Sequence, residues 1–192
     1  MNKLNIAIAG AIAATGLAMA APASADQYVS AQLGVSQIGN YTTPYGSYSF
    51  DNGLALIATY GHDIPAVHKY FGIEGEVSKS IVNPSVNSYW YGYGVSADYD
   101  YWTAGAYAVF SIPVTDKVSI RARGGLVYNH WTISDCVAGF GCYDYSSNDI
   151  NPSIGGGATY KLNENINLMA EVTAFSVTDS NFHVSAGAQF KF

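Results

Sequence analysis

The segment Phe182–Phe192 reads F-H-V-S-A-G-A-Q-F-K-F. Successive side chains of a β-strand point to opposite faces, so alternate residues of this segment share a face. The apolar face carries Phe182, Val184, Ala186, Ala188, Phe190 and Phe192. The polar face carries His183, Ser185, Gly187, Gln189 and Lys191. Strict alternation that ends on an aromatic residue is typical of a strand in a membrane-spanning β-barrel, with lipid on one side and a polar interior on the other.

The first 25 residues have the three parts of a secretory signal peptide. Lys3 supplies the positive start, residues 6–19 form an apolar run, and Ala23-Ser24-Ala25 is a small-residue cleavage site. We therefore predict cleavage after Ala25 and assign residues 26–192 to one domain. No cysteine lies at the cleavage site, so a lipid anchor is not expected there.

The remaining chain has no stretch of the roughly 18 consecutive apolar residues that a spanning helix needs. A membrane protein without such helices must be a closed barrel, because every backbone polar group in lipid needs a protein partner. A secreted β-sandwich is the soluble alternative. The sixteen Tyr, the twenty Gly and the charged fraction of only 11% favour the barrel, since soluble domains carry about 25% charged residues.

The two-residue period recurs along the chain and predicts eight strands. They cover residues 27–36, 52–62, 70–82, 98–113, 117–130, 150–162, 165–177 and 182–192. The connections 62–69, 114–117 and 161–164 are short or compact, which indicates periplasmic turns. The connections 37–51, 83–97 and 131–149 are long and polar, which indicates outer loops, and a short fourth outer loop covers 178–181. The predicted fold is all-β: an eight-stranded, antiparallel, up-and-down transmembrane barrel.

Several segments resemble the OmpA-like and opacity-like outer-membrane barrels, a superfamily that includes small "porin family" proteins. They are residues 112–118 (I-P-V-T-D-K-V) with Ile120 and 123–125, residues 71–74 (F-G-I-E), and residues 155–160 with Glu171. The resemblance covers residues 26–192. It implies a location in the outer membrane of a Gram-negative bacterium, among lipid and lipopolysaccharide, and it does not fix a function.

The same resemblance extends to biogenesis. The spacing of Ser185, Gly187, Phe190 and Phe192 is similar to the carboxy-terminal signal that the barrel-assembly machinery recognises in this class. The implied partners are therefore that machinery and periplasmic chaperones.

Five charged residues are expected inside the barrel, because a charge facing lipid at mid-depth costs roughly 2–4 kcal/mol. They are Glu74, Glu76, Arg121, Arg123 and Glu171. One interpretation is a network that plugs the interior, which in an eight-stranded barrel is just wide enough to be filled by side chains. The other is an ion pathway. The resemblance implies interior acid–base pairs at Glu74 and Arg123, one of which has been considered a gate, but Met169 and Thr159 stand where a base and an acid are expected.

Two enzyme hypotheses remain open. Glu74 and Glu76 are paired carboxylates, as in glycosidases, although a packed barrel offers no sugar cleft. His183 and Ser185 resemble the H-x-S element of lipid A deacylases, in which His is the base for a Ser nucleophile. Ala186 departs from the Asn expected after that Ser, and the position of His183 at the loop end suggests an interfacial side chain. We predict no catalytic site and no cofactor.

Cys136 and Cys142 are the two cysteines, and they flank the sequence V-A-G-F-G in the third outer loop. In an exported protein this spacing predicts a disulfide, which contributes roughly 2–3 kcal/mol at most in the entropy model. A metal site is the weaker alternative, because His130 is the only histidine nearby. No metal site is predicted.

Aromatic residues mark the two membrane interfaces. Those expected at the outer interface are Tyr89, Trp90, Tyr91, Tyr93, Tyr99, Trp102, Tyr128 and Trp131. The run from Tyr89 to Tyr93 exceeds what an interface needs, so it is a candidate surface for a host or environmental ligand. Phe140 and Tyr143 beside the disulfide are further candidates. The alternative is that the barrel simply extends above the membrane there.

The chain carries eight basic and fourteen acidic residues, a net charge of −6, and loss of Lys3 with the leader makes it −7. This balance argues against nucleic-acid binding, which depends on neutralising phosphates. Acidic outer loops serve solubility in the simplest interpretation and bind bridging divalent cations in the alternative. The expected role is structural or surface-interacting, with a narrow channel and a lipid A hydrolase as alternatives.

Overall fold

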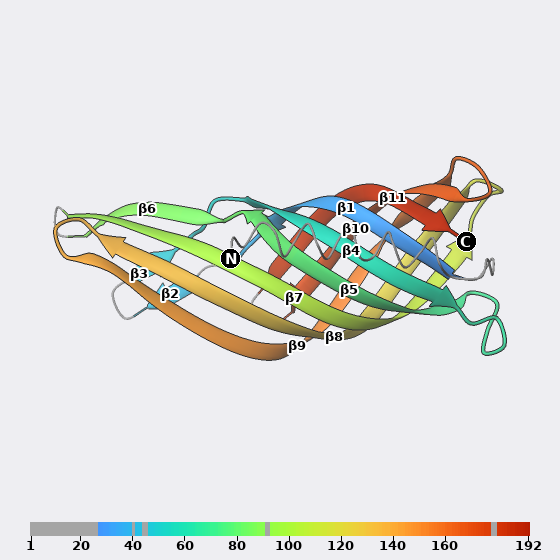
Figure 1. Cartoon of the computed structure of the whole chain (residues 1–192), viewed down its shortest axis with the longest axis horizontal. Coiled ribbons are helices and arrows are strands. Elements are labelled where there is room, and N and C mark those ends of the chain that lie inside the picture. Colours follow the sequence, from blue (N-terminus) through green and yellow to red (C-terminus); the bar gives the residue numbers. More distant parts are fainter. Residues whose placement is uncertain (1–26, 40, 44–45, 91–92, 178–179) are drawn as a thin grey trace.

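The computed structural model describes residues 27–192 except 40, 44–45, 91–92 and 178–179, with the backbone alone for the rest of 41–48 and 88–93. The predicted signal peptide and its cleavage site lie outside these residues. Eight strands form one closed antiparallel ring, with neighbours in the order β5, β4, β1, β11, β10, β9, β8, β7 and back to β5. They are β1 (Gln27–Gln37), β4 (Gly53–Asp63), β5 (Phe71–Val82), β7 (Tyr93–Pro113), β8 (Val118–Val137), β9 (Gly141–Lys161), β10 (Ile166–Ser176) and β11 (Asn181–Lys191). The predicted eight-stranded meander is confirmed (Figure 1).

The ring closes where the sequence alternates most strictly. β11 pairs with β1 without a break from Phe182–Gln37 to Lys191–Tyr28. On β11, His183, Ser185 and Gln189 are buried in the interior, while Val184 and Phe190 are exposed on the outside. The two faces predicted for this segment are confirmed, and burial alternates in the same way on the other strands of the ring.

The turns at one end of the barrel are as short as predicted, and we call this the periplasmic end. Val114 N donates to Val118 O at 2.8 Å, and Leu162 N donates to Ile166 O at 3.0 Å. The third turn joins β4 to β5 through residues 64–70, and the carboxy terminus lies at the same end (Figure 1). Among the residues described, no helix is long and apolar enough to cross a membrane.

At the opposite end, residues 83–97 and 131–149, predicted as outer loops, are largely extended strands, in agreement with the alternative that the barrel continues above the membrane. Residues 131–149 continue β8 and β9, whose pairing is unbroken from Val118–Tyr160 to Val137–Gly141. Within 83–97, β6 (Ser85–Trp90) pairs with the start of β7. In water neither face of a sheet needs to be apolar, so these segments lose the alternation on which the prediction depended.

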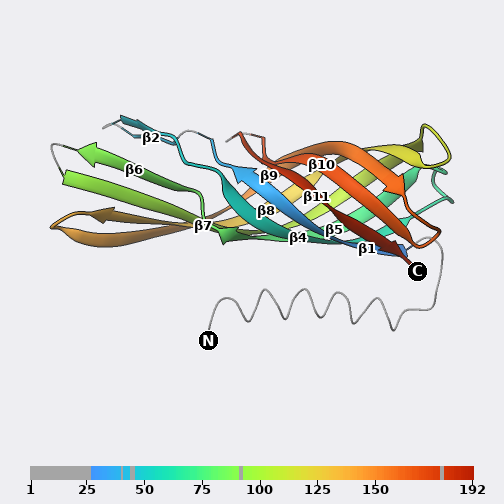
Figure 2. The ribbon, with the colours of Figure 1, turned by 90° about the horizontal axis from the view of Figure 1, so that it is seen from above.

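These segments form a four-stranded sheet that stands beyond the ring (Figures 1 and 2). It comprises β6 and residues 93–101 of β7, 131–137 of β8 and 141–149 of β9, and we call it the outer sheet. β10 pairs with β9 only up to Ile154, and β5 pairs with β7 only up to Trp102, so the ring ends there. Within the predicted first outer loop, β2 (Tyr41–Thr43) and β3 (Gly46–Tyr48) form a separate small hairpin.

Candidate functional site: the barrel interior and the outer sheet

The five charged residues predicted for the interior meet in one network at the periplasmic half of the barrel. Arg121 forms ion pairs with Glu74 and, at 3.1 Å from Nε to Oε1, with Glu171. Arg123 Nη1 lies 2.5 Å from Glu76 Oε2 and 3.5 Å from Glu74 Oε2. All five side chains are at most 3% exposed. Both carboxylates of the Glu74–Glu76 pair are thus engaged by guanidinium groups.

Neutral side chains complete this network, and sequence reasoning did not find them. Tyr28 donates its hydroxyl to Glu74 at 2.7 Å, and Arg123 donates to Thr173 Oγ1 at 2.6 Å. The Arg123 guanidinium also lies 4.4 Å from the centre of the Tyr107 ring, a cation–π distance. The two hydrogen-bonded pairs are 46 and 50 residues apart in sequence, so only the strand register brings them together.

Two glycines of the run 155–157 make room for the charges. Gly157 pairs with both Arg121 and Glu171, and Gly155 pairs with Arg123 and Thr173. A Cβ at Gly157 would lie 2.7 Å from Glu171 Cγ and 2.1 Å from a backbone oxygen. The run 155–157 was the one available signal in the sequence that the interior is crowded at this level.

His183 and Ser185 share a face, as predicted, but the expected interfacial position of His183 is wrong. The imidazole is 1% exposed, lies 4.3 Å from the Phe175 ring centre, and has Nε2 2.8 Å from the Tyr101 hydroxyl. Ser185 Oγ instead donates to Gln32 Oε1 at 2.8 Å. A histidine at a loop end turns inward here because the outer half of the interior is aromatic.

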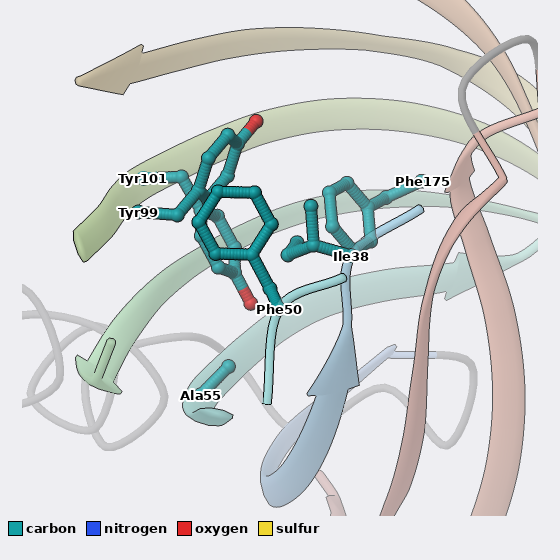
Figure 3. Close-up of a cluster of buried hydrophobic side chains, with 6 residues drawn as sticks. All are labelled: Ile38, Phe50, Ala55, Tyr99, Tyr101 and Phe175. Carbon is teal, nitrogen blue, oxygen red and sulfur yellow. The ribbon is translucent and has the colours of Figure 1, made fainter. Parts of the chain in front are cut away.

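That outer half is filled by an apolar cluster (Figure 3). Its buried members are Ile38, Phe50, Ala55, Tyr99, Tyr101 and Phe175. Tyr101 and Phe175 stack at 5.3 Å between ring centres, and Tyr99 stacks on Trp131 at 5.9 Å. The prediction that Tyr99 and Trp131 belong to the outer membrane interface is therefore wrong, because odd-numbered residues of β7 and β8 face inward. Trp102 and Tyr128 do face outward, 5.4 Å apart.

The aromatic contacts continue from this cluster onto the outer sheet. Trp131 is 5.5 Å from Tyr145, whose side chain is 61% exposed. Trp131 Nε1 donates to Asp149 Oδ2 at 3.1 Å, and Asp149 Oδ1 accepts from Asn129 at 2.9 Å. The indole is therefore held in a fixed orientation by a hydrogen bond and by stacking.

The predicted disulfide between Cys136 and Cys142 is present in the structure. It lies at the tip of the β8–β9 hairpin, where only the pair Val137–Gly141 separates it from the turn at residues 138–140. Gly139 and Gly141 have φ values of 86° and 101°, which other residues rarely adopt. The cysteines are thus used in a cross-link, and within the described residues no group of three potential metal ligands occurs.

The candidate surface residues are only partly described. Phe140 in the turn and Tyr143 on β9 are 65% and 70% exposed. The backbones of Tyr89, Trp90 and Tyr93 lie in β6 and β7, but their side chains, and all of Tyr91, lie outside the description. Tyr145, which prediction from sequence missed, joins Tyr143 on one face of β9 because the two are two residues apart.

The proposed assembly-signal residues occupy different faces of β11. Ser185 is buried in the interior, whereas Phe190 is 45% exposed on the lipid side and Phe192 is half-buried. A Cβ at Gly187 would meet the Ala31 carbonyl oxygen at 2.0 Å, so Gly187 also has a packing role. Recognition by assembly machinery stays a prediction.

Residues 9–192 match the family model described as the outer membrane protein beta-barrel domain. The chain belongs to this family. Its outer-membrane location follows from that membership. A search of curated proteins finds no match.

Solved structures with the same fold include the Neisserial surface protein A, with a TM-score of 0.61, 17% identity, and coverage of 90% of this chain and 100% of that one. The attachment invasion locus protein Ail of Yersinia pestis, solved with the heparin analogue sucrose octasulfate, has a TM-score of 0.53 at 17% identity, covering 86% and 99%. The amino-terminal barrel of Pseudomonas aeruginosa OprF has a TM-score of 0.54 at 11% identity, covering 86% and 97%. Identities this low establish the fold alone.

Proposed function

We propose that this protein is a non-enzymatic surface-interaction barrel, in which the outer sheet binds ligands and the barrel anchors it. The observation that supports this most directly is the ordered aromatic face of the outer sheet. Tyr145 and Tyr143 are largely exposed, and Trp131 beneath Tyr145 is fixed by Asp149 and by Tyr99. Rigid, partly exposed aromatic side chains lose little conformational entropy on binding, which is why they serve as anchors at recognition surfaces.

Charge narrows the ligand class. The described acidic residues of the outer half are Asp51, Asp98, Asp100, Asp135, Asp144 and Asp149. In that half of the described chain Lys79 is the one basic residue, and it pairs with Asp100. Potentials of opposite sign favour association, and like charges oppose it. We therefore propose an uncharged or cationic ligand, unlike the sulfated heparin analogue found with Ail.

The proposal includes no hydrolytic role. His183 and Ser185 are 1% and 6% exposed inside the barrel, and their hydrogen bonds go to Tyr101 and Gln32. A lipid A hydrolase would need its nucleophile and base together on a surface that the lipid reaches. The buried positions support a structural role for both residues.

The test is binding of cells that express the protein to immobilised uncharged glycans, cationic peptides and sucrose octasulfate. We expect binding to one of the first two classes and none to the third. The substitutions Phe140→Ser, Tyr143→Ser and Tyr145→Ser together should reduce that binding about tenfold or more, as expected when anchor side chains worth over 1 kcal/mol are removed.

The matched control is Ser134→Ala with Ser146→Ala, which changes the opposite face of the same hairpin. It should bind as the wild type does. Heat-modifiable gel mobility would show that all variants are folded. If the triple variant bound as well as the wild type, the outer sheet would not be the binding surface.

A further inference from the structure

The lipid-facing surface carries a groove of about 530 Å³ near the periplasmic end of β4, β5, β7 and β8. Two rows of paired residues line it. The row nearer the periplasm is His62, Ile73, Ala108 and Gly124, and the next is Tyr60, Gly75, Ala106 and Leu126. The small residues form the floor, and Tyr60 and Leu126, 50% and 60% exposed, form opposite walls.

The groove is a real depression rather than a crowded row of glycines. A Cβ at Gly75 or Gly124 would meet nothing within 4 Å. Gly155 and Gly157, by contrast, are glycines because any side chain there would collide with the interior network. Nothing in the packing of the barrel requires glycine at 75 or 124, so the space above them needs another explanation.

The polar end of the groove indicates what fills it. His62 lines the groove on β4, beside Tyr60, and its Nδ1 atom is buried without a hydrogen-bond partner in the described part of the chain. An imidazole at the edge of hydrocarbon is stabilised only when it finds a polar partner. Beyond it, in the turn 64–70, the exposed Lys69 lies over the Tyr70 ring at 4.6 Å and has no ion-pair partner among the described residues.

We propose that this groove is a binding site for one phospholipid of the periplasmic leaflet. One acyl chain lies over Gly75, Ala106 and Gly124, the glycerol backbone lies near His62, and Lys69 attracts the phosphate. Hydrocarbon is the medium on this face, and a phospholipid supplies both the apolar chain for the floor and the polar acceptor for His62. The inference does not rest on the proposed function of the outer sheet.

A second copy of the chain is the competing occupant, since small residues also allow close contact between membrane segments. Charge argues against it. A two-fold axis makes both subunits use the same surface patch, so a dimer through this groove would bring two copies of the Lys69 charge to one interface, and like charges oppose association. A phosphate, by contrast, complements both Lys69 and His62.

The experiment measures phospholipid retained by the full-length mature barrel after folding into vesicles of phosphatidylethanolamine and phosphatidylglycerol and extraction into mild detergent. Native mass spectrometry counts the bound lipids. Gly75→Leu with Gly124→Leu fills the groove at two positions where a Cβ meets no atom within 4 Å, and it should lower retention about tenfold, the effect of losing roughly two buried methylene contacts. The control is Ala170→Leu with Ala186→Leu, a paired lipid-facing position on the opposite side of the ring, which should retain lipid as the wild type does.

A second pair of variants separates the contribution of the lipid headgroup to retention from that of the acyl chain. Lys69→Ala should reduce retention, whereas Lys117→Ala, in the exposed turn between β7 and β8, should not. Equal retention by the groove-filled variant and its control would overturn the proposal. A wild-type dimer that becomes monomeric in Gly75→Leu/Gly124→Leu, with no lipid bound to either, would overturn it in favour of a second copy.

Discussion

Arg121 shows how single residues hold the interior together. It pairs with Glu74 and Glu171, while Arg123 pairs with Glu76 and Glu74. Within the network three carboxylates therefore face two guanidinium groups, and the positive charges are the scarcer partners. Removing one guanidinium leaves one buried carboxylate without an ion pair, Glu171 or Glu76, whereas removing one carboxylate leaves every guanidinium with a partner.

Arg121→Met should therefore destabilise the barrel by about 3–5 kcal/mol, the usual effect of breaking a buried ion pair. Glu171→Gln should lower stability by only about 1 kcal/mol, since Arg121 keeps Glu74 and the amide can still bond Gln32. Unfolding by urea in phospholipid vesicles, followed by tryptophan fluorescence, measures both. Glu164→Gln in an exposed turn is the control and should change stability by less than about 0.5 kcal/mol. Equal losses for the two interior variants would contradict this asymmetry.

At this scale the sequence predicts which residues share the interior but not which of them touch. Placing Glu74 and Arg121 on inward faces needs only the two-residue period and the high free energy of a charge in lipid. Pairing them needs the stagger of β5 against β8, which no local pattern encodes. The same limit explains why Tyr28 and Thr173 were not found.

Among the elements, the strands within the membrane are predictable and the outer sheet is not. On β5, Glu74 and Glu76 alternate with Ile73 and Val77 because one side meets lipid and the other a polar interior. On residues 141–149 of β9 both faces are largely exposed to water, so the sequence pattern does not separate a lipid-facing side from an interior side. The two cysteines were the local signal that a hairpin continues to that point.

The disulfide should stabilise that hairpin tip and not the barrel. Closing a loop of this size contributes roughly 2 kcal/mol in the entropy model, and the cross-link joins the segments of β8 and β9 that extend beyond the ring. Cys136→Ser with Cys142→Ser should speed hydrogen exchange at residues 131–149 by up to roughly 30-fold. Amides in the β10–β11 pairing are the internal control and should be unchanged. A comparable fall in the stability of the whole barrel would show that the outer sheet and the ring unfold together.

Across the whole molecule, two different layers fill the interior in series. From the periplasmic end, a polar cavity of about 300 Å³ reaches from Thr115 and Glu164 to Arg121. The charged network, which includes Arg121, lies next to this cavity. The cluster around Tyr101 and Phe175 lies beyond the network, toward the outer end. A solute would have to displace paired charges and then pass a layer of stacked aromatic rings, and each layer is close-packed with its own neighbours.

This arrangement leads us to expect no steady conductance from the refolded barrel in a planar bilayer, in the wild type or in Glu74→Gln. Breaking the charged layer alone leaves the aromatic layer in place, and Tyr101→Ala with Phe175→Ala alone leaves the charged layer in place, so that variant should also be silent. Heat-modifiable gel mobility would establish folding, and a large porin in the same bilayer would establish sensitivity. Steady wild-type conductance that changes in Glu74→Gln would instead make the charged network a solute path. The outer sheet would then be the rim of a narrow channel, and its aromatic face would act at the entrance rather than as an independent binding surface.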